Sequence, residues 1–255
     1  MTERNEDTAW QEDYQPSQAG NDPEDAFAVP FNVIDGVALV VWTIVAQILI
    51  FAPLLAAGFE LGNGVPSLLV LIATQLVIGG GIVAWLAARG SLSWRVLGPI
   101  RPRPGRHVPV GLGVGALGFM LVTVTVMVAD QLFGPFEAPS QQLLETTTSG
   151  GLLATLLGVV IAVVLAPIVE ETIFRGVLFQ ALHRRLGYWW AVALSGAMFS
   201  AVHVEITQWA LRLALFLLGA WFAIALRRWG SLLVPIMGHA VFNGVAIALS
   251  LTVTQ

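Results

Sequence analysis

The chain contains seven apolar stretches that are long enough, or nearly long enough, to cross a lipid bilayer. A helix needs about 20 apolar residues to span roughly 30 Å of hydrocarbon. The stretches lie at residues 33–57, 67–88, 110–129, 152–182, 188–203, 209–226 and 232–253, of which the fourth is long and the fifth is short. None has the alternating period of a membrane β-barrel strand. The sequence therefore predicts an all-α fold, a polytopic transmembrane helix bundle with about seven spans.

Composition agrees with a membrane protein and narrows its chemistry. The 255 residues are 56% hydrophobic and only 11% charged, which is far too apolar for a soluble globular domain. The chain has no cysteine, so disulfides, thiolate zinc sites and a cysteine nucleophile are excluded. The expected surroundings are the lipid bilayer, and no nucleic-acid partner is expected.

The first 29 residues differ from the rest. They carry eight acidic residues against Arg4 alone: Glu3, Glu6, Asp7, Glu12, Asp13, Asp22, Glu24 and Asp25. Such a segment has too little apolar surface to fold, and it lacks the basic and apolar regions of a signal peptide. We therefore divide the chain into a disordered acidic tail, residues 1–29, and a transmembrane helical domain, residues 30–255.

Arginines predict how the bundle is oriented. They follow the second, fourth and sixth spans, at Arg89, Arg95, Arg101, Arg103 and Arg106, then Arg184 and Arg185, then Arg227 and Arg228. If the spans alternate in direction, all three groups fall on one side, which the positive-inside rule makes cytoplasmic. The sequence thus predicts a multi-pass protein of the plasma membrane with a cytoplasmic N-terminus and an external C-terminus.

Five polar side chains lie inside these apolar stretches: Glu170, Glu171, His203, His239 and Asn243. Ionisable groups are costly in hydrocarbon, so they usually face a partner or a water-filled cavity and mark a working site. At 1.5 Å per residue, Glu170, His239 and His203 lie about 20, 16 and 24 Å from the basic ends of their spans. These depths are similar enough for the three side chains to meet.

The residue types within this set leave two kinds of chemistry open. A glutamate beside a histidine can take a proton from water, and a second histidine with an amide can donate hydrogen bonds to the oxyanion of a tetrahedral intermediate. One carboxylate and two imidazoles can instead bind zinc with an open fourth position. Glu171 and Arg175 are four residues apart, a spacing that allows an ion pair on one helix face.

Three short motifs carry a family resemblance. Residues 170–175 read EETIFR, residues 199–203 read FSAVH and residues 239–243 read HAVFN. In order and spacing they resemble the motifs of the CAAX prenyl endopeptidase and bacteriocin-processing (CPBP, or Abi) family of intramembrane glutamate proteases. The resemblance covers residues 165–250, the motif core of the predicted domain, and the upstream spans match in hydropathy alone.

The resemblance implies a helical protease with its active site in a cavity within the bilayer. By that likeness Glu170 is the general base on water, assisted by His203, while His239 and Asn243 stabilise the oxyanion. Glu171, Arg175 and Phe199 then support the site. No cofactor is expected, and if the enzyme were metal-dependent, zinc would be held by Glu170, His203 and His239. The implied partner is a membrane-anchored peptide or protein substrate.

Two functions from other classes remain open at this stage. Glutamate and histidine chains inside a bundle also relay protons, so a proton-coupled membrane transporter is one alternative. A membrane immunity or chaperone scaffold without catalysis is the other. The motif for a zinc protease, H-E-x-x-H, is missing. Arg212, which enters the sixth span, receives no role from the sequence.

Overall fold

The computed structural model describes residues 31–59, 64–90, 103–134, 151–203 and 208–253. Within these ranges the regular structure is entirely helical, which confirms the predicted all-α fold. The predicted acidic tail, residues 1–29, lies outside the described residues. The same holds for Arg95, Arg101 and Glu205.

The helices occupy the seven apolar stretches. The elements are α2 (Val33–Ala56), α3 (Val65–Ala88), α4 (Pro104–Phe133), α6 (Gly151–Val159), η4 (Val160–Leu165), α7 (Ala166–Glu171), η5 (Thr172–Phe179), α8 (Gln180–Leu186), α9 (Tyr188–Val202), α10 (Trp209–Trp229) and α11 (Leu233–Val253). The run from α6 to α8 is one uninterrupted helix, in which η4 and η5 are π-helical.

Local sequence signals set several helix ends. Asn32 caps α2 through a reciprocal pair of bonds, because its side chain accepts from the Asp35 N–H and the Asp35 carboxylate accepts from the Asn32 N–H. Later in the chain, α10 ends at Gly230, whose φ of 66° lies in the left-handed region that favours glycine. Asp35 also pairs with Arg89 at 2.6 Å, which ties the start of α2 to the end of α3.

Six helices in the described part of the chain are long and apolar enough to cross a membrane. The exception among the seven predicted spans is α9, which has 15 residues and is therefore about 22 Å long. The helix ends at Val202, one residue before His203. The chain is a multi-pass membrane protein, while its orientation in the membrane stays a prediction.

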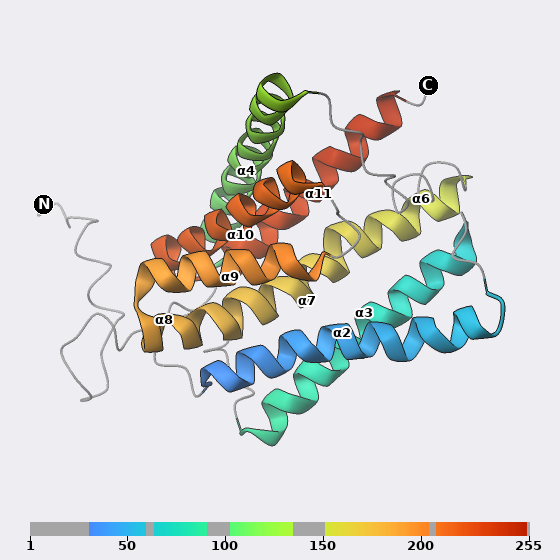
Figure 1. Ribbon diagram of the computed structural model, residues 1–255, viewed down its shortest axis with the longest axis horizontal. Helices are drawn as coiled ribbons and strands as arrows, with labels where there is room; N and C mark the ends of the chain where they lie inside the picture. Colours follow the sequence, from blue (N-terminus) through green and yellow to red (C-terminus); the bar gives the residue numbers. More distant parts are fainter. Residues whose placement is uncertain (1–30, 60–63, 91–102, 135–150, 204–207, 254–255) are drawn as a thin grey trace, which may run out of the picture.

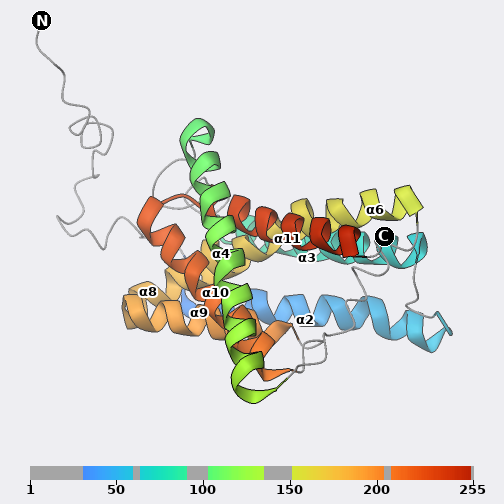
Figure 2. The same ribbon diagram turned by 90° about the horizontal axis from the view of Figure 1, so that it is seen from above.

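The long helix from α6 to α8 runs through the middle of the bundle. Figure 1 shows α2 and α3 on one side of it and α9, α10, α11 and α4 on the other. Seen from above, α4 crosses α10 and α11, which it contacts along much of its length (Figure 2). The central helix thus has neighbours on both sides, and its residues 173–183 are all buried.

Two packed clusters hold these helices together. The larger one surrounds η5, where Ile173, Val177 and Leu178 are fully buried against α2, α3, α9 and α10. The second joins α4, α10 and α11 through Val114, Phe222 and neighbouring side chains. Side chains such as Ile34 and Leu49 are instead more than half exposed, as expected where a helix faces lipid.

Small residues allow α9 and α10 to approach closely. A Cβ atom added at Gly196 would lie 2.8 Å from the Phe216 carbonyl oxygen and 3.0 Å from the Ala220 nitrogen. At the outer turn of the same contact, the Ser200 hydroxyl donates to the Arg212 carbonyl at 2.8 Å. The two helices are therefore fixed against each other just before the chain reaches His203.

Candidate active site

Both glutamates lie at the end of α7, between the two π-helical segments. Pro167 lies in the first turn of this short helix and has no N–H to donate to the turn before it. The chain remains helical because the hydrogen-bond register changes there: the Ala166 N–H donates to the Ile161 carbonyl, five residues back. Such π-helical segments are rare, and they are found often at functional sites.

Glu171 is the centre of a buried ionic cluster. Its Oε1 atom accepts a hydrogen bond from Arg175 Nη1 at 3.0 Å, the contact that the four-residue spacing predicts. The same oxygen lies 2.9 Å from Nδ1 of His239, which is 68 residues away in the chain. Glu171 and Arg175 are fully buried, and 5% of His239 is exposed. A buried ion pair needs good geometry and further hydrogen bonds to offset the loss of water, and here Oε1 of Glu171 has two partners while its Oε2 has none among the described residues.

Aromatic rings enclose the cluster. The Arg175 guanidinium carbon lies 4.5 Å from the centre of the Phe199 ring and 5.5 Å from that of Phe222. Its Nη2 atom donates to the Gly219 carbonyl at 2.8 Å. Phe222 also stacks on the His239 ring with centroids 5.6 Å apart. Cation–π interactions are stronger where water is excluded, so these contacts stabilise the charged guanidinium group inside the bundle.

Glu170 and His203 face each other across a wider gap. Glu170 Oε2 and His203 Nε2 are 3.9 Å apart, which is longer than a direct hydrogen bond. Their side chains are 20% and 23% exposed, in contrast to the closed cluster around Glu171. The other ring nitrogen of His203, Nδ1, lies 2.8 Å from the Phe199 carbonyl. Because a carbonyl only accepts, Nδ1 carries the proton and Nε2 is directed toward Glu170.

Asn243 lies one helical turn beyond His239 on α11. Its amide Nδ2 donates to the Ala162 carbonyl, in the π-helical segment η4, at 2.7 Å. An amide nitrogen has two N–H groups, so one of them remains for a further acceptor. Between the two histidines lies Phe199, with ring centroids 4.9 Å from His203 and 5.9 Å from His239. Direct contacts thus link six of the seven residues singled out from the sequence, and Asn243 lies one turn beyond them on α11, bonded to Ala162.

Phe222 and Gly219, both on α10, also belong to this cluster and were not expected from the sequence. Neither carries a signal of its own, because a phenylalanine and a glycine are ordinary residues in an apolar span. Arg212 meets the site region through its backbone carbonyl, which accepts from the Ser200 hydroxyl. Glu205, two residues after His203, lies outside the described residues.

The positions of the possible metal ligands bear on the alternative that this site binds zinc. Among the residues that the structure describes, no three histidine or acidic side chains are grouped as metal ligands would be. His239 contacts Glu171 through Nδ1, which leaves Nε2 as the ring nitrogen that a zinc ion at Glu170 and His203 would need. Metal-bound histidines commonly donate their other ring N–H to a carboxylate, so this contact alone does not exclude the zinc alternative.

Comparison with known proteins agrees with this cluster of residues. Residues 151–245 match the family model described as "Type II CAAX prenyl endopeptidase Rce1-like". A Bacillus subtilis (strain 168) protein named "Putative membrane peptidase YdiL" is 30% identical over 93 residues, which cover 36% of this chain and 37% of that protein. An Escherichia coli protein named "Uncharacterized 24.3 kDa protein" is 30% identical over 136 residues, which cover 52% of this chain and 61% of that protein.

The chain therefore spans less than two thirds of the length of either curated relative. No solved structure matches it. The matched segment runs from the start of α6 to the middle of α11, so it contains all three motifs, and the resemblance inferred from them is confirmed. Over residues 151–245 the chain is thus similar to the Rce1-like type II CAAX prenyl endopeptidases.

Proposed function

We propose that the protein is an intramembrane endopeptidase that hydrolyses a peptide bond of a membrane-associated substrate with a water molecule activated by Glu170 and His203. The observation that carries the proposal is the facing pair itself: a carboxylate and an imidazole 3.9 Å apart, partly exposed, in the middle of an apolar bundle. A water bound beside both atoms can hydrogen-bond to each at once. That arrangement is what general-base catalysis requires.

The proposed reaction needs no covalent intermediate. The water oxygen attacks the peptide carbonyl carbon while one water proton passes to Glu170, and the carbonyl oxygen becomes an oxyanion. Glu170 then gives that proton to the leaving nitrogen as the carbon–nitrogen bond breaks. His203 orients the water through Nε2, since its Nδ1–H is held by the Phe199 carbonyl.

His239 and Asn243 are the proposed oxyanion donors. His239 uses Nδ1 toward Glu171, so donation to an oxyanion falls to Nε2, which must carry a proton as well. The active form of His239 is therefore the doubly protonated ring, whose charge Glu171 balances. With Arg175 the cluster then has one net positive charge, which favours a developing oxyanion. The free N–H of Asn243 is the second donor.

The substrate proposed is a membrane-anchored peptide or protein. Two features support it: the site lies within helices of membrane-spanning length, and the Bacillus relative bears a name that includes membrane peptidase. Acting on such a substrate places the enzyme within the bilayer, with the plasma membrane as its proposed location. The acidic residues 1–29 receive no role in the reaction.

The test compares new protein termini in membranes of cells that produce the wild-type chain, Glu170→Gln or Arg228→Gln. Arg228→Gln is the matched control, because Arg228 lies at the end of α10 beside Trp229 and away from the site. Termini found with the wild type and the control, but not with Glu170→Gln, identify substrates. Loss of a general base lowers the rate by about 10²–10⁴-fold with a purified, liposome-embedded substrate.

Equal cleavage by the wild type and Glu170→Gln would contradict the mechanism. The other functions have their own readouts in the same liposomes. Proton flux that Glu170→Gln abolishes would favour a transporter. A chain that folds, binds a membrane protein partner and cleaves nothing would favour the scaffold.

A further inference from the structure

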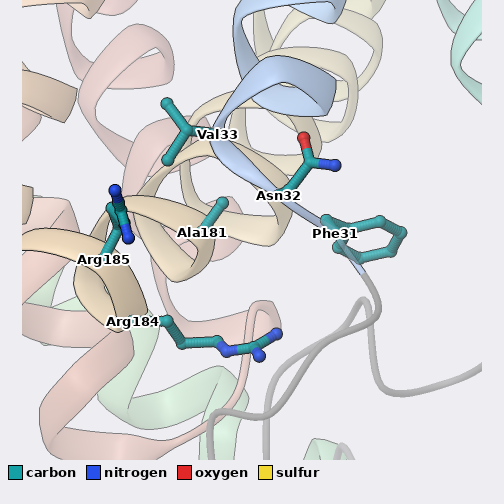
Figure 3. Close-up of a pocket in the computed structure, with 6 residues that line it drawn as sticks. All are labelled: Phe31, Asn32, Val33, Ala181, Arg184 and Arg185. Atoms are coloured by element: carbon teal, nitrogen blue, oxygen red, sulfur yellow. The ribbon is translucent and has the colours of Figure 1, made fainter.

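A hollow of about 480 Å³ lies far from the catalytic cluster, between the start of α2 and the end of α8 (Figure 3). The residues that line it are Phe31, Asn32, Val33, Ala181, Arg184 and Arg185. Ala181 is eleven residues after Glu170, so the hollow is about 16 Å along the central helix from the catalytic pair. The reaction proposed above does not use it.

Two guanidinium groups flank this hollow. Figure 3 shows Arg184 extending below Phe31 and Arg185 lying beside Val33, with the small side chain of Ala181 between them. Both arginines are exposed and lie in the last turn of α8, where the helix dipole favours positive charge. The two guanidinium groups bring positive charge to the wall of the hollow.

The opposite wall is the first turn of α2. Asn32 lines it, next to the apolar side chains of Phe31 and Val33. The Asn32 N–H and Oδ1 are bonded to Asp35, so the polar donor that Asn32 brings to the hollow is its side-chain amide nitrogen. The hollow thus combines cationic and polar groups with an apolar wall, which suits a ligand that is itself amphipathic and anionic.

Neighbouring residues indicate the level of the hollow in the membrane. Directly after α8, the chain turns at Gly187 and α9 begins with Trp189 and Trp190 in its first turn, which are 72% and 67% exposed. Exposed tryptophans are typical of the boundary between hydrocarbon and headgroups. On the other side, Ile34 is 74% exposed beside the hollow. These side chains place Arg184 and Arg185 where lipid phosphates lie.

We propose that this hollow binds the phosphate headgroup of an anionic phospholipid. Arg184 and Arg185 bind the phosphate, and Phe31, Val33 and Ala181 contact the glycerol and upper acyl region. A free phosphate ion shares the first contact but gains nothing from the apolar wall. The lipid therefore ties the start of α2 to the end of α8, on the helix that carries both glutamates.

The test measures lipid binding to the purified full-length chain in detergent by native mass spectrometry. The probes are phosphatidylglycerol, phosphatidylcholine with the same acyl chains, and inorganic phosphate. The variant is Arg184→Gln/Arg185→Gln, and the matched control is Arg227→Gln/Arg228→Gln, two arginines at the end of α10 that do not line the hollow. Each arginine near anionic lipid contributes about fivefold, so the variant is expected to bind phosphatidylglycerol roughly 30-fold more weakly.

The control pair is expected to keep the affinity and the preference for phosphatidylglycerol over phosphatidylcholine. Equal losses in the two double variants would show a diffuse charge effect and overturn the site. Equal binding of phosphatidylglycerol and phosphatidylcholine would also overturn the site. If inorganic phosphate displaces phosphatidylglycerol when both have the same concentration, the ligand is free phosphate and the lipid proposal is wrong. Arg184→Lys/Arg185→Lys, which keeps the charge, is expected to restore most binding and separates charge loss from misfolding.

The acidic tail is the rival occupant, since it precedes Phe31 directly and carries opposite charge. In the full-length chain, Asp22→Asn, Glu24→Gln and Asp25→Asn together remove its three nearest charges. If the wild type binds no phosphatidylglycerol and this triple variant does, the tail fills the hollow and the lipid proposal is wrong. Unchanged binding in the triple variant supports it.

Discussion

Glu171 and His239 share a buried hydrogen bond of 2.9 Å between Oε1 and Nδ1, while the adjacent Glu170 makes no contact of that length with a histidine. Two successive glutamates therefore have different environments. One belongs to a closed ionic cluster with Arg175, and the other lies in a partly open pair with His203. This difference separates a structural carboxylate from a reactive one, and it leads to opposite expectations for two conservative substitutions.

Glu171→Gln is expected to destabilise the fold. It leaves the fully buried Arg175 guanidinium without its counter-charge, and breaking a buried pair in this way costs about 3–5 kcal/mol. The measurement is thermal unfolding of the purified protein in detergent. Glu171→Gln/Arg175→Met removes both charges and is expected to recover part of the stability. A single variant as stable as the wild type would show that the ion pair does not hold the helices together.

Glu170→Gln is expected to leave the fold intact while it abolishes cleavage. The Glu170 side chain is 20% exposed and its nearest histidine nitrogen is 3.9 Å away. Replacing its carboxylate with an amide therefore breaks no short contact with a histidine and should cost little folding free energy. The free energy of unfolding in the same detergent should change by less than about 1 kcal/mol. A loss as large as that of Glu171→Gln would mean that Glu170 is a structural residue too.

Asn243→Ala is expected to slow cleavage, because it removes a proposed oxyanion donor. Loss of one such donor lowers the rate by about 10²–10³-fold. The measurement is the cleavage rate of the purified, liposome-embedded substrate, with thermal unfolding in detergent as the check that the variant folds. A folded variant that cleaves as fast as the wild type would show that Asn243 does not stabilise the oxyanion.

Gly196→Ala is expected to separate α9 from α10 and to displace His203. The new methyl group would lie 2.8 Å from the Phe216 carbonyl oxygen, which is backbone and cannot turn aside. Such overpacking costs about 1–3 kcal/mol and should lower cleavage as well. Gly113→Ala is the matched control, because nothing lies within 4 Å of its added Cβ. Similar behaviour of the two variants would rule out close helix contact at Gly196.

Removing metal ions is expected to leave cleavage unchanged. Within the described ranges, no three histidine or acidic side chains are grouped as zinc ligands would be. The measurement combines chelation with metal analysis of the purified protein. Stoichiometric zinc whose removal abolishes cleavage and whose return restores it would make Glu170, His203 and His239 ligands.

The sequence predicted the parts of this site that depend on spacing within one helix. The Glu171 and Arg175 pair follows from the four-residue repeat, and counting depth along three spans correctly indicated that Glu170, His203 and His239 lie at a common level. The depth of a residue along its span does not determine the direction in which its side chain points around the helix axis. For that reason the contact between His239 and Glu171, across 68 residues, was not predicted.

Other features have no local signal at all. Phe222 stacks on His239, yet any apolar side chain would satisfy the pattern of its span. Helix boundaries were predicted well where hydropathy changes sharply, as at α9, which ends one residue before the predicted His203. In contrast, α4 begins six residues before and ends four residues after the predicted span 110–129. The residues of the hollow at α2 and α8 come from segments almost 150 residues apart, which only the fold brings together.

The π-helical segments on both sides of α7 change how the central helix responds to a change in chain length. A π-helical turn holds an additional residue compared with an α-helical turn. Deleting one residue from η5 would let a turn return to α-helical geometry, while the residues after it keep their orientation relative to Glu170. Deleting one residue from α7 removes no such additional residue, so everything after it would rotate by about 100°. A single deletion in η5 should therefore disturb the contacts of α8 less than a single deletion in α7.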